Sequence, residues 1–180
     1  MAECGPSPDS AAPSAGITLD VDVVRHDDAW DDAGIADKLL VRAAQAALAE
    51  APALPAGAYE LTILLTDDDE MRALNRNWRG KDSPTNVLSF PASESLSGPG
   101  LLGDIALGYQ TIRDEARERD LAPPDHVSHL VVHGVLHLLG CDHADEQQAE
   151  RMEALERKAL TSLGIADPYA DQPYVSELSS

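Results

Sequence analysis

Short apolar segments recur along this chain, and the pattern within and between them predicts a mixture of strands and helices. Residues 17–24 (ITLDVDVV) alternate apolar and polar side chains, which is typical of a half-buried strand. Three further short apolar runs lie between turn-forming residues and predict strands as well. The predicted strands are 17–24, 59–66, 86–90 and 101–108.

Longer segments without internal proline predict helices. The last of them carries an apolar stripe with spacings of three and four residues, which marks one buried helix face. That stripe consists of Met152, Leu155, Ala159 and Leu163. The predicted helices cover 34–50, 67–78, 109–120, 126–139 and 145–163.

Residues at the ends of these segments support the boundaries. Thr66 and Asp125 each precede a predicted helix, and their side chains are suited to capping backbone N–H groups. Gly140 and Gly164 follow predicted helices, where a left-handed residue commonly ends the helix. The order strand-helix-strand-helix-strand-strand-helix-helix-helix is neither strictly alternating nor segregated, so we predict the α+β class.

The length of 180 residues favours one domain with its own core. We expect that domain to be a metal hydrolase covering 17–165, for the reasons given below. Residues 1–16 are rich in Pro, Ser, Ala and Gly and predict a disordered acidic tail, and 166–180 predict a loose C-terminal tail.

The net charge of −19 argues against a protein that coats nucleic acid non-specifically, so any RNA contact requires a local basic patch. The start of the chain has no basic segment followed by an apolar one, and no apolar run is long enough to span a bilayer. Cys4 and Cys141 form no CxxC pair, which suits a reducing compartment. We expect a cytoplasmic protein that does not bind a membrane.

The strongest chemical signal is the segment HGVLHLLGCDH, residues 133–143. His133 and His137 are four residues apart on a predicted helix, which places both rings on one face, one turn apart. Gly140 lets the chain reverse, so that His143 can provide a third ligand. Three protein ligands leave a fourth position open, as in catalytic zinc sites. The spacing also matches the metal-binding positions of the metzincin motif.

Nearby residues leave alternatives open. His126 and His129 precede the motif on the same helix. They either pack near the site or face solvent, which we favour, or take part in proton transfer or phosphate contact. Asp142 either orients a ligand histidine or caps the last helix. Cys141 is interpreted as a loop or packing residue rather than a fourth ligand.

The motif lacks the glutamate that zinc peptidases use as a general base. The residue after the first histidine is Gly134. A zincin-type metalloprotease is therefore an unfavourable alternative, because it would need a carboxylate from elsewhere in the chain.

A basic segment lies upstream, in MRALNRNWRGKDSPTNVLSFP, residues 71–91. Its helical arginines, Arg72 and Arg76, are interpreted mainly as parts of a solvated face. Arg79 stands at the predicted end of the helix beside a glycine turn, and its planar guanidinium suits a phosphate. Trp78 either packs or stacks on a base.

The segments HGVLHLLGCDH, WRGKDSPTNVLSFP and LLGDIALG together resemble the YbeY family of bacterial rRNA-maturation endoribonucleases. The resemblance covers roughly residues 59–163. Two positions depart from the family pattern: Cys141 stands where Tyr is common, and Asn86 stands where Asp is frequent. Neither departure removes a metal ligand, although Asn86 argues against a catalytic carboxylate there.

The resemblance implies a zincin-like α+β fold, with a small mixed four-stranded sheet and about five helices. It implies one Zn²⁺ per chain on His133, His137 and His143, and a catalytic or RNA-binding role for Arg79. The implied substrate is single-stranded RNA, and no DNA is expected. The implied role is ribosomal RNA maturation, especially at the small-subunit 3′ end, and ribosome quality control, with the small ribosomal subunit as partner.

With that site, zinc would polarise a phosphoryl oxygen or lower the pKa of a bound water, and Arg79 would offset charge in the transition state. The residues leave open whether water or the 2′-hydroxyl attacks, and which group is the general base. A further alternative is a non-catalytic ribosome-assembly factor whose zinc is structural. It predicts that histidine variants unfold and that Arg79→Ala keeps cellular function.

Overall fold

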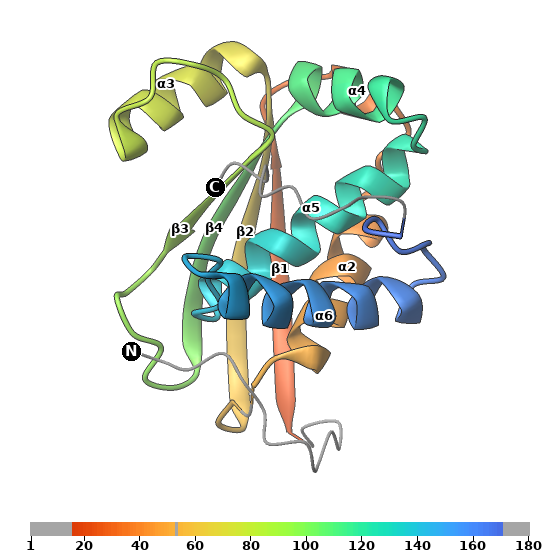
Figure 1. The fold of residues 1–180 in the computed structure, drawn as a ribbon. Helices are drawn as coiled ribbons and strands as arrows, with labels where there is room; N and C mark the ends of the chain where they lie inside the picture. Colours follow the sequence, from red (N-terminus) through yellow and green to blue (C-terminus); the bar gives the residue numbers. More distant parts are fainter. Residues whose placement is uncertain (1–15, 53, 171–180) are drawn as a thin grey trace.

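The computed structural model describes residues 16–52 and 54–170, and these residues form one mixed sheet with helices around it (Figure 1). The sheet order is β1-β2-β4-β3. Strands β1, β2 and β4 are parallel, and β3 runs antiparallel to β4. The strands are β1 (Ile17–Arg25), β2 (Gly57–Thr66), β3 (Val87–Pro91) and β4 (Gly100–Gly108).

Six helices occur among the described residues, and the bounds of five of them agree with the predicted segments to within three residues. They are α1 (Ala29–Asp32), α2 (Asp37–Glu50), α3 (Asp68–Arg79), α4 (Tyr109–Glu118), α5 (Pro123–Leu138) and α6 (Glu146–Ser162). The prediction of an α+β fold with a four-stranded mixed sheet is confirmed. The structure adds α1, whose four residues are too few for a periodic pattern to reveal.

Two predicted caps are wrong by one to three residues. The N-cap of α3 is Asp67, whose carboxylate accepts a hydrogen bond from the Glu70 N–H, rather than Thr66. Helix α5 begins at Pro123, because proline needs no N–H partner in the first turn of a helix. Asp125 therefore lies inside the first turn, where its charge complements the helix dipole.

One face of the sheet carries most of the core. Alternate residues of β2, from Tyr59 to Leu65, point to this face and are fully buried. Helices α2, α5 and α6 cover it, and α5 crosses the sheet between the strands and α6 (Figure 1). Helix α5 is buried on nearly every side, so its polar residues occupy interior positions.

The other face of the sheet is covered in part by α3, whose buried Met71 packs with Leu88 of β3 and Ala106 of β4. This contact packs the first turn of α3 against β3 and β4, and near the C-terminal end of α3 the ring of Trp78 contacts Phe90 of β3. None of the helices in the described ranges is both long and apolar enough to cross a membrane.

Helix α5 lies very close to β4 at one glycine. A Cβ atom at Gly134 would lie 3.0 Å from Cδ1 of Ile105 and 3.3 Å from two further carbons of that side chain. The position that follows the first motif histidine therefore faces the sheet and has no room for a larger side chain.

The predicted tails lie mostly outside the described residues. Only Gly16 of the first tail and 166–170 of the second are described. The division into a domain at 17–165 and two tails therefore stays a prediction.

A candidate metal centre beside an open pocket

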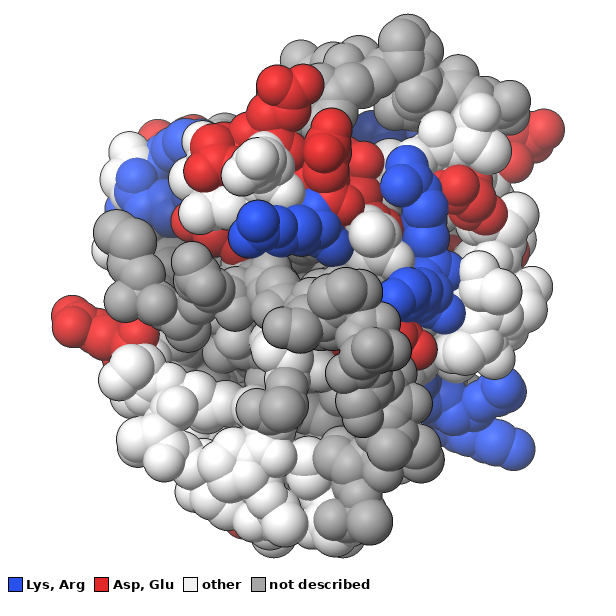
Figure 2. Space-filling model, turned by 60° about the horizontal axis from the view of Figure 1, so that its bottom comes forward, with Lys and Arg blue, Asp and Glu red and all other residues white. Residues whose placement is uncertain are grey.

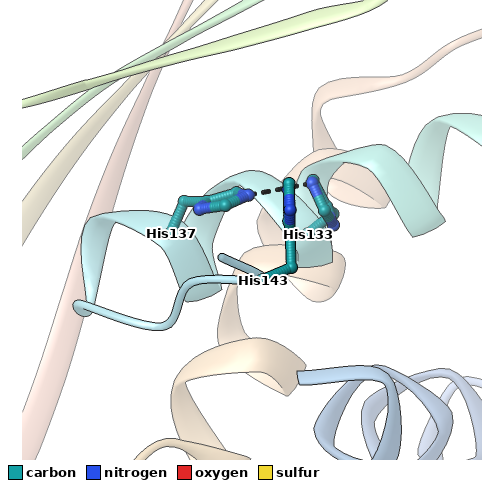
Figure 3. Close-up of side chains that lie close together, drawn as sticks. All are labelled: His133, His137 and His143. Carbon is teal, nitrogen blue, oxygen red and sulfur yellow. Dashed lines mark hydrogen bonds between the residues drawn. The ribbon is translucent and has the colours of Figure 1, made fainter. Parts of the chain in front are cut away.

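Three histidine rings converge at the C-terminal end of α5, as predicted (Figure 3). His133 and His137 extend from successive turns of α5, with their Nε2 atoms 3.0 Å apart. The ring of His143 lies 5.9 Å from that of His133 and 5.1 Å from that of His137, centroid to centroid. One nitrogen from each ring lies within 4.8 Å of the other two.

The turn after α5 brings His143 back to the helix. Gly140 has a φ angle of 91°, a left-handed conformation that glycine adopts without steric cost. Its N–H donates to the His137 carbonyl and the Cys141 N–H donates to the Leu136 carbonyl, which is the pair of bonds of a Schellman motif. The predicted role of Gly140 in reversing the chain is thus seen directly.

The three imidazoles fit a metal ion. Imidazole suits zinc and several other transition metals, and ligands of a tetrahedral zinc at ~2.0–2.1 Å lie roughly 3.3 Å apart. Burial, together with the neighbouring charges of His133 and His143, lowers the pKa of His137 to about 3. His137 is therefore neutral at physiological pH, and a metal-ligating imidazole must be neutral.

A buried carboxylate next to the histidines was missed from the sequence. Glu156 of α6 is 1% exposed and accepts a hydrogen bond from Nδ1 of His133 over 2.5 Å. Burial alone would raise the pKa of Glu156, but hydrogen bonds from His129 and His133 outweigh burial and hold that pKa well below its ordinary value. Glu156 lies four residues after Met152 and three before Ala159, on the same helix face as the apolar stripe of α6. Its position on that face was the sequence feature that could have predicted a buried carboxylate.

A pocket of about 390 Å³ lies beside the histidines. The C-terminal end of α3, strand β3 and the turn after α5 form its walls. It is lined by Trp78, Arg79, Leu88, Ser89, Pro91, His137, Gly140, Cys141 and Asp142. The structure thus brings Arg79 and the metal-ligand candidate His137 to one cavity.

Arg79 differs from the other arginines of α3. Its Nη1 atom is buried and has no hydrogen-bond partner among the described residues. Arg72 and Arg76, by contrast, lie on the surface and pair with Asp82. The interpretation of Arg72 and Arg76 as a solvated face is supported, and Arg79 retains an unused donor at the pocket.

Trp78 lies at the pocket and is 54% exposed. Its ring packs edge-on against Phe90, with centroids 5.1 Å apart. The two interpretations of Trp78 are compatible, because one edge of the indole packs while much of its surface remains accessible.

The upstream histidines are buried and paired. His126 donates to Glu115 over 2.8 Å, and His129 lies 3.3 Å from Glu156, which supports the packing interpretation for both. Asn86 also binds Glu115, away from the pocket. Burial alone would raise the pKa of Glu115, but hydrogen bonds from His126 and Asn86 outweigh it and lower that pKa below its ordinary value.

Asp142 supports the loop that carries His143. Its carboxylate accepts a hydrogen bond from the His143 backbone N–H over 2.7 Å. The last helix is capped by Asp145 instead, so the capping alternative for Asp142 is wrong.

Comparison with known proteins decides the family. The model of the family Endoribonuclease YbeY matches residues 27–164 of this chain. The chain belongs to the YbeY family. The resemblance inferred from its three motif segments is thereby confirmed.

Curated YbeY-family relatives match over most of their length. A protein called Endoribonuclease YbeY from Azorhizobium caulinodans is 50% identical over 155 residues, which cover 84% of this chain and 97% of the relative. Another of that name, from a Chelativorans species, is 51% identical and covers 88% and 97%. A third, from Rhodopseudomonas palustris strain HaA2, is 48% identical and covers 96% and 89%.

The solution structure of TM1509 from Thermotoga maritima has a similar fold. It matches with a TM-score of 0.51 and 22% identity, over 84% of this chain and 96% of that protein. At this identity the likeness shows a shared fold and carries no argument about function.

Proposed function

We propose that this protein is a zinc-dependent, single-strand-specific endoribonuclease, with one Zn²⁺ held by His133, His137 and His143. Membership of a family named for endoribonuclease activity supports the reaction class. The observation that carries the proposal is a cluster of three histidines, one of which, His137, lines a pocket together with Arg79. Arg79 has a buried donor nitrogen that is unpaired among the described residues.

The zinc ion and the residues of the chain would make different contributions to the reaction. When bound, zinc would supply Lewis-acid activation of the phosphodiester or of the attacking oxygen. The chain supplies two ligands on the buried helix α5, a third from the turn that follows it, and a pocket large enough for part of a nucleotide. Because His137 is neutral, it is ready to bind the ion without first losing a proton.

Arg79 is proposed to bind the scissile phosphate. Its free guanidinium N–H groups match phosphate oxygens in geometry and charge. Charge that builds on those oxygens in the transition state would strengthen the interaction, which is the condition for catalysis rather than simple binding.

The preference for single strands is supported by an exposed aromatic side chain at the pocket. Base recognition on an aromatic side chain requires an unstacked base, which single strands provide and duplexes do not. Trp78 offers an exposed indole surface at the pocket.

We extend the proposal to the biological substrate, ribosomal RNA, and to maturation of the small-subunit 3′ end and ribosome quality control in the cytoplasm. The family resemblance supports this extension. In a bacterial strain that lacks its own family member, the wild-type gene should remove small-subunit RNA with an extended 3′ end, and the Arg79→Ala gene should not.

A peptidase is the less favourable alternative. The position that zinc peptidases use for their general base is Gly134, where a Cβ atom would meet Ile105 at 3.0 Å, so the base would have to come from elsewhere in the chain. Glu156, the buried carboxylate beside the histidines, is already bonded to His133 and His129.

Metal removal tests the proposal. Purified wild-type protein and His137→Ala should be assayed on single-stranded RNA and on casein, with and without chelator, after metal content and folding have been measured. We expect wild type to cut RNA only when loaded with metal, and casein to remain intact.

The folded His137→Ala protein should lose both bound metal and RNA cleavage. RNA cleavage that survives complete metal removal would contradict the mechanism. Unfolding of His137→Ala, together with wild-type cellular function of Arg79→Ala, would favour the structural-zinc alternative.

A further inference from the structure

Glu156 is an unusual residue for its position, because it is an almost fully buried carboxylate on the apolar face of α6. A buried charge is costly unless every oxygen has a partner. Both oxygens of Glu156 have partners, and these partners come from two separate segments of the chain, helix α5 and the segment after α6.

The two oxygens serve different partners. Oε1 accepts from Nδ1 of His133 over 2.5 Å. Oε2 lies 3.3 Å from Nε2 of His129 and accepts a hydrogen bond from the hydroxyl of Tyr169. The arrangement places one oxygen at the metal-ligand candidate and anchors the other in the protein interior.

Tyr169 belongs to the segment that follows α6 and returns to the buried carboxylate. Its ring packs edge-on against His129, with centroids 5.7 Å apart. The guanidinium of Arg157 lies 5.2 Å from the centre of the tyrosine ring. These two contacts hold the ring, and with it the hydroxyl, in place at Glu156.

The contact with Glu156 selects one tautomer of His133. An ionised carboxylate only accepts hydrogen bonds, so Nδ1 of His133 must carry the proton. In the neutral ring the lone pair then lies on Nε2, and this is the atom 3.0 Å from Nε2 of His137. The lone pair is therefore directed at the point where the three histidines converge (Figure 3).

We propose that Glu156 is a positioning residue for the metal centre: it holds His133 as the Nδ1–H tautomer with Nε2 facing the ion, and Tyr169 holds Glu156. The inference rests on the metal site of the proposed function. It adds that affinity for the ion depends on a carboxylate from α6 that touches neither the ion nor the RNA.

The tautomer is tested first, in metal-free wild-type protein. Imidazole ¹⁵N shifts, measured by long-range ¹H–¹⁵N correlation, should show His133 protonated at Nδ1 and not at Nε2. This measurement needs no variant, so it does not depend on how well a variant folds. A ring protonated at Nε2 would overturn the proposal.

Zinc affinity is tested next, by competition with a chromophoric chelator. Glu156→Gln keeps the shape but loses the charge, and should bind zinc about 10–100-fold more weakly. Glu150→Gln makes the same change at an exposed site on α6 and should bind zinc like wild type. Tyr169→Phe removes only a hydroxyl and should weaken binding less than Glu156→Gln does.

The outcomes separate this inference from the proposed function. If Glu156→Gln binds zinc as tightly as wild type, Glu156 is a structural residue and the inference fails, while the ribonuclease proposal stands. If wild type binds zinc and shows the predicted tautomer but does not cut RNA, the proposed function fails and the positioning role survives. If wild type binds no zinc, both fail.

Discussion

At the scale of single residues, the structure separates side chains that look equivalent in the sequence. Arg76 and Arg79 lie three residues apart on α3, yet Arg76 pairs with Asp82 at the surface and Arg79 lines the pocket. Apart from the family resemblance, the sequence offered only the helix end and the neighbouring glycine turn as reasons to single out Arg79. Its proximity to His137 depends on how α3 packs against β3, which no local pattern encodes.

Trp78 provides a prediction at this scale. Replacing it with alanine should weaken binding of single-stranded RNA by about 1–3 kcal/mol, because base–aromatic stacking has that magnitude. Trp78→Phe should restore most of the affinity, since it keeps a ring against Phe90. Fluorescence anisotropy with a labelled oligonucleotide measures both variants, and an unchanged affinity for Trp78→Ala would mean that the indole only packs.

Glu156 shows a residue that the sequence could have identified. It lies four residues after Met152 and three before Ala159, on the apolar face of the predicted helix, so a buried carboxylate was predictable. Its partner was not, because the contact between α6 and His133 depends on the packing of two helices.

At the scale of elements, the strands and longer helices follow from apolar patterning. What that patterning could not provide is the antiparallel direction of β3 and the sheet order, in which β4 lies between β2 and β3. These features depend on contacts between strands that are distant in the sequence. The short helix α1 and the start of α5 were missed because local packing and proline geometry decide them.

The close contact between α5 and β4 yields a prediction at this scale. Gly134→Ala should lower the free energy of unfolding by about 1 kcal/mol, since overpacking of about 1–3 kcal/mol exceeds the gain of about 1 kcal/mol in helix propensity. Gly134→Glu should cost about 3 kcal/mol or more, because its carboxylate would be buried without a partner. Urea unfolding measures both.

The same variants test the peptidase alternative. Gly134→Glu restores the sequence of a zinc peptidase at this position, but the site faces Ile105. We expect no cleavage of casein. A stable Gly134→Glu protein that cut casein would show that this position reaches the metal centre.

At the scale of the whole molecule, charge constrains how RNA is bound. The chain has 32 acidic and 13 basic residues, and on the face drawn in Figure 2 the coloured basic side chains lie among acidic ones. A surface of this kind repels a long polyanion, so RNA binding has to come from a few contacts at the site.

Salt dependence provides a prediction at this scale. Each phosphate neutralised on a single strand contributes about −0.7 to the slope of log affinity against log salt concentration. We expect a slope of about −2 or shallower for chelator-treated wild type, measured by anisotropy. A slope steeper than about −4 would indicate an extended basic surface that the described residues do not suggest.

The central claim is that the histidines and Arg79 act together on RNA, and one measurement tests it most directly. Single-turnover cleavage of single-stranded RNA should be compared for zinc-loaded wild type, Arg79→Ala and the matched control Arg76→Ala. Loss of one donor to the transition state typically costs about 100-fold or more in rate, and we expect that loss for Arg79→Ala. An exposed substitution usually changes free energies by less than about 0.5 kcal/mol, so Arg76→Ala should remain near wild type. Wild-type cleavage by a folded, zinc-loaded Arg79→Ala protein would contradict the account.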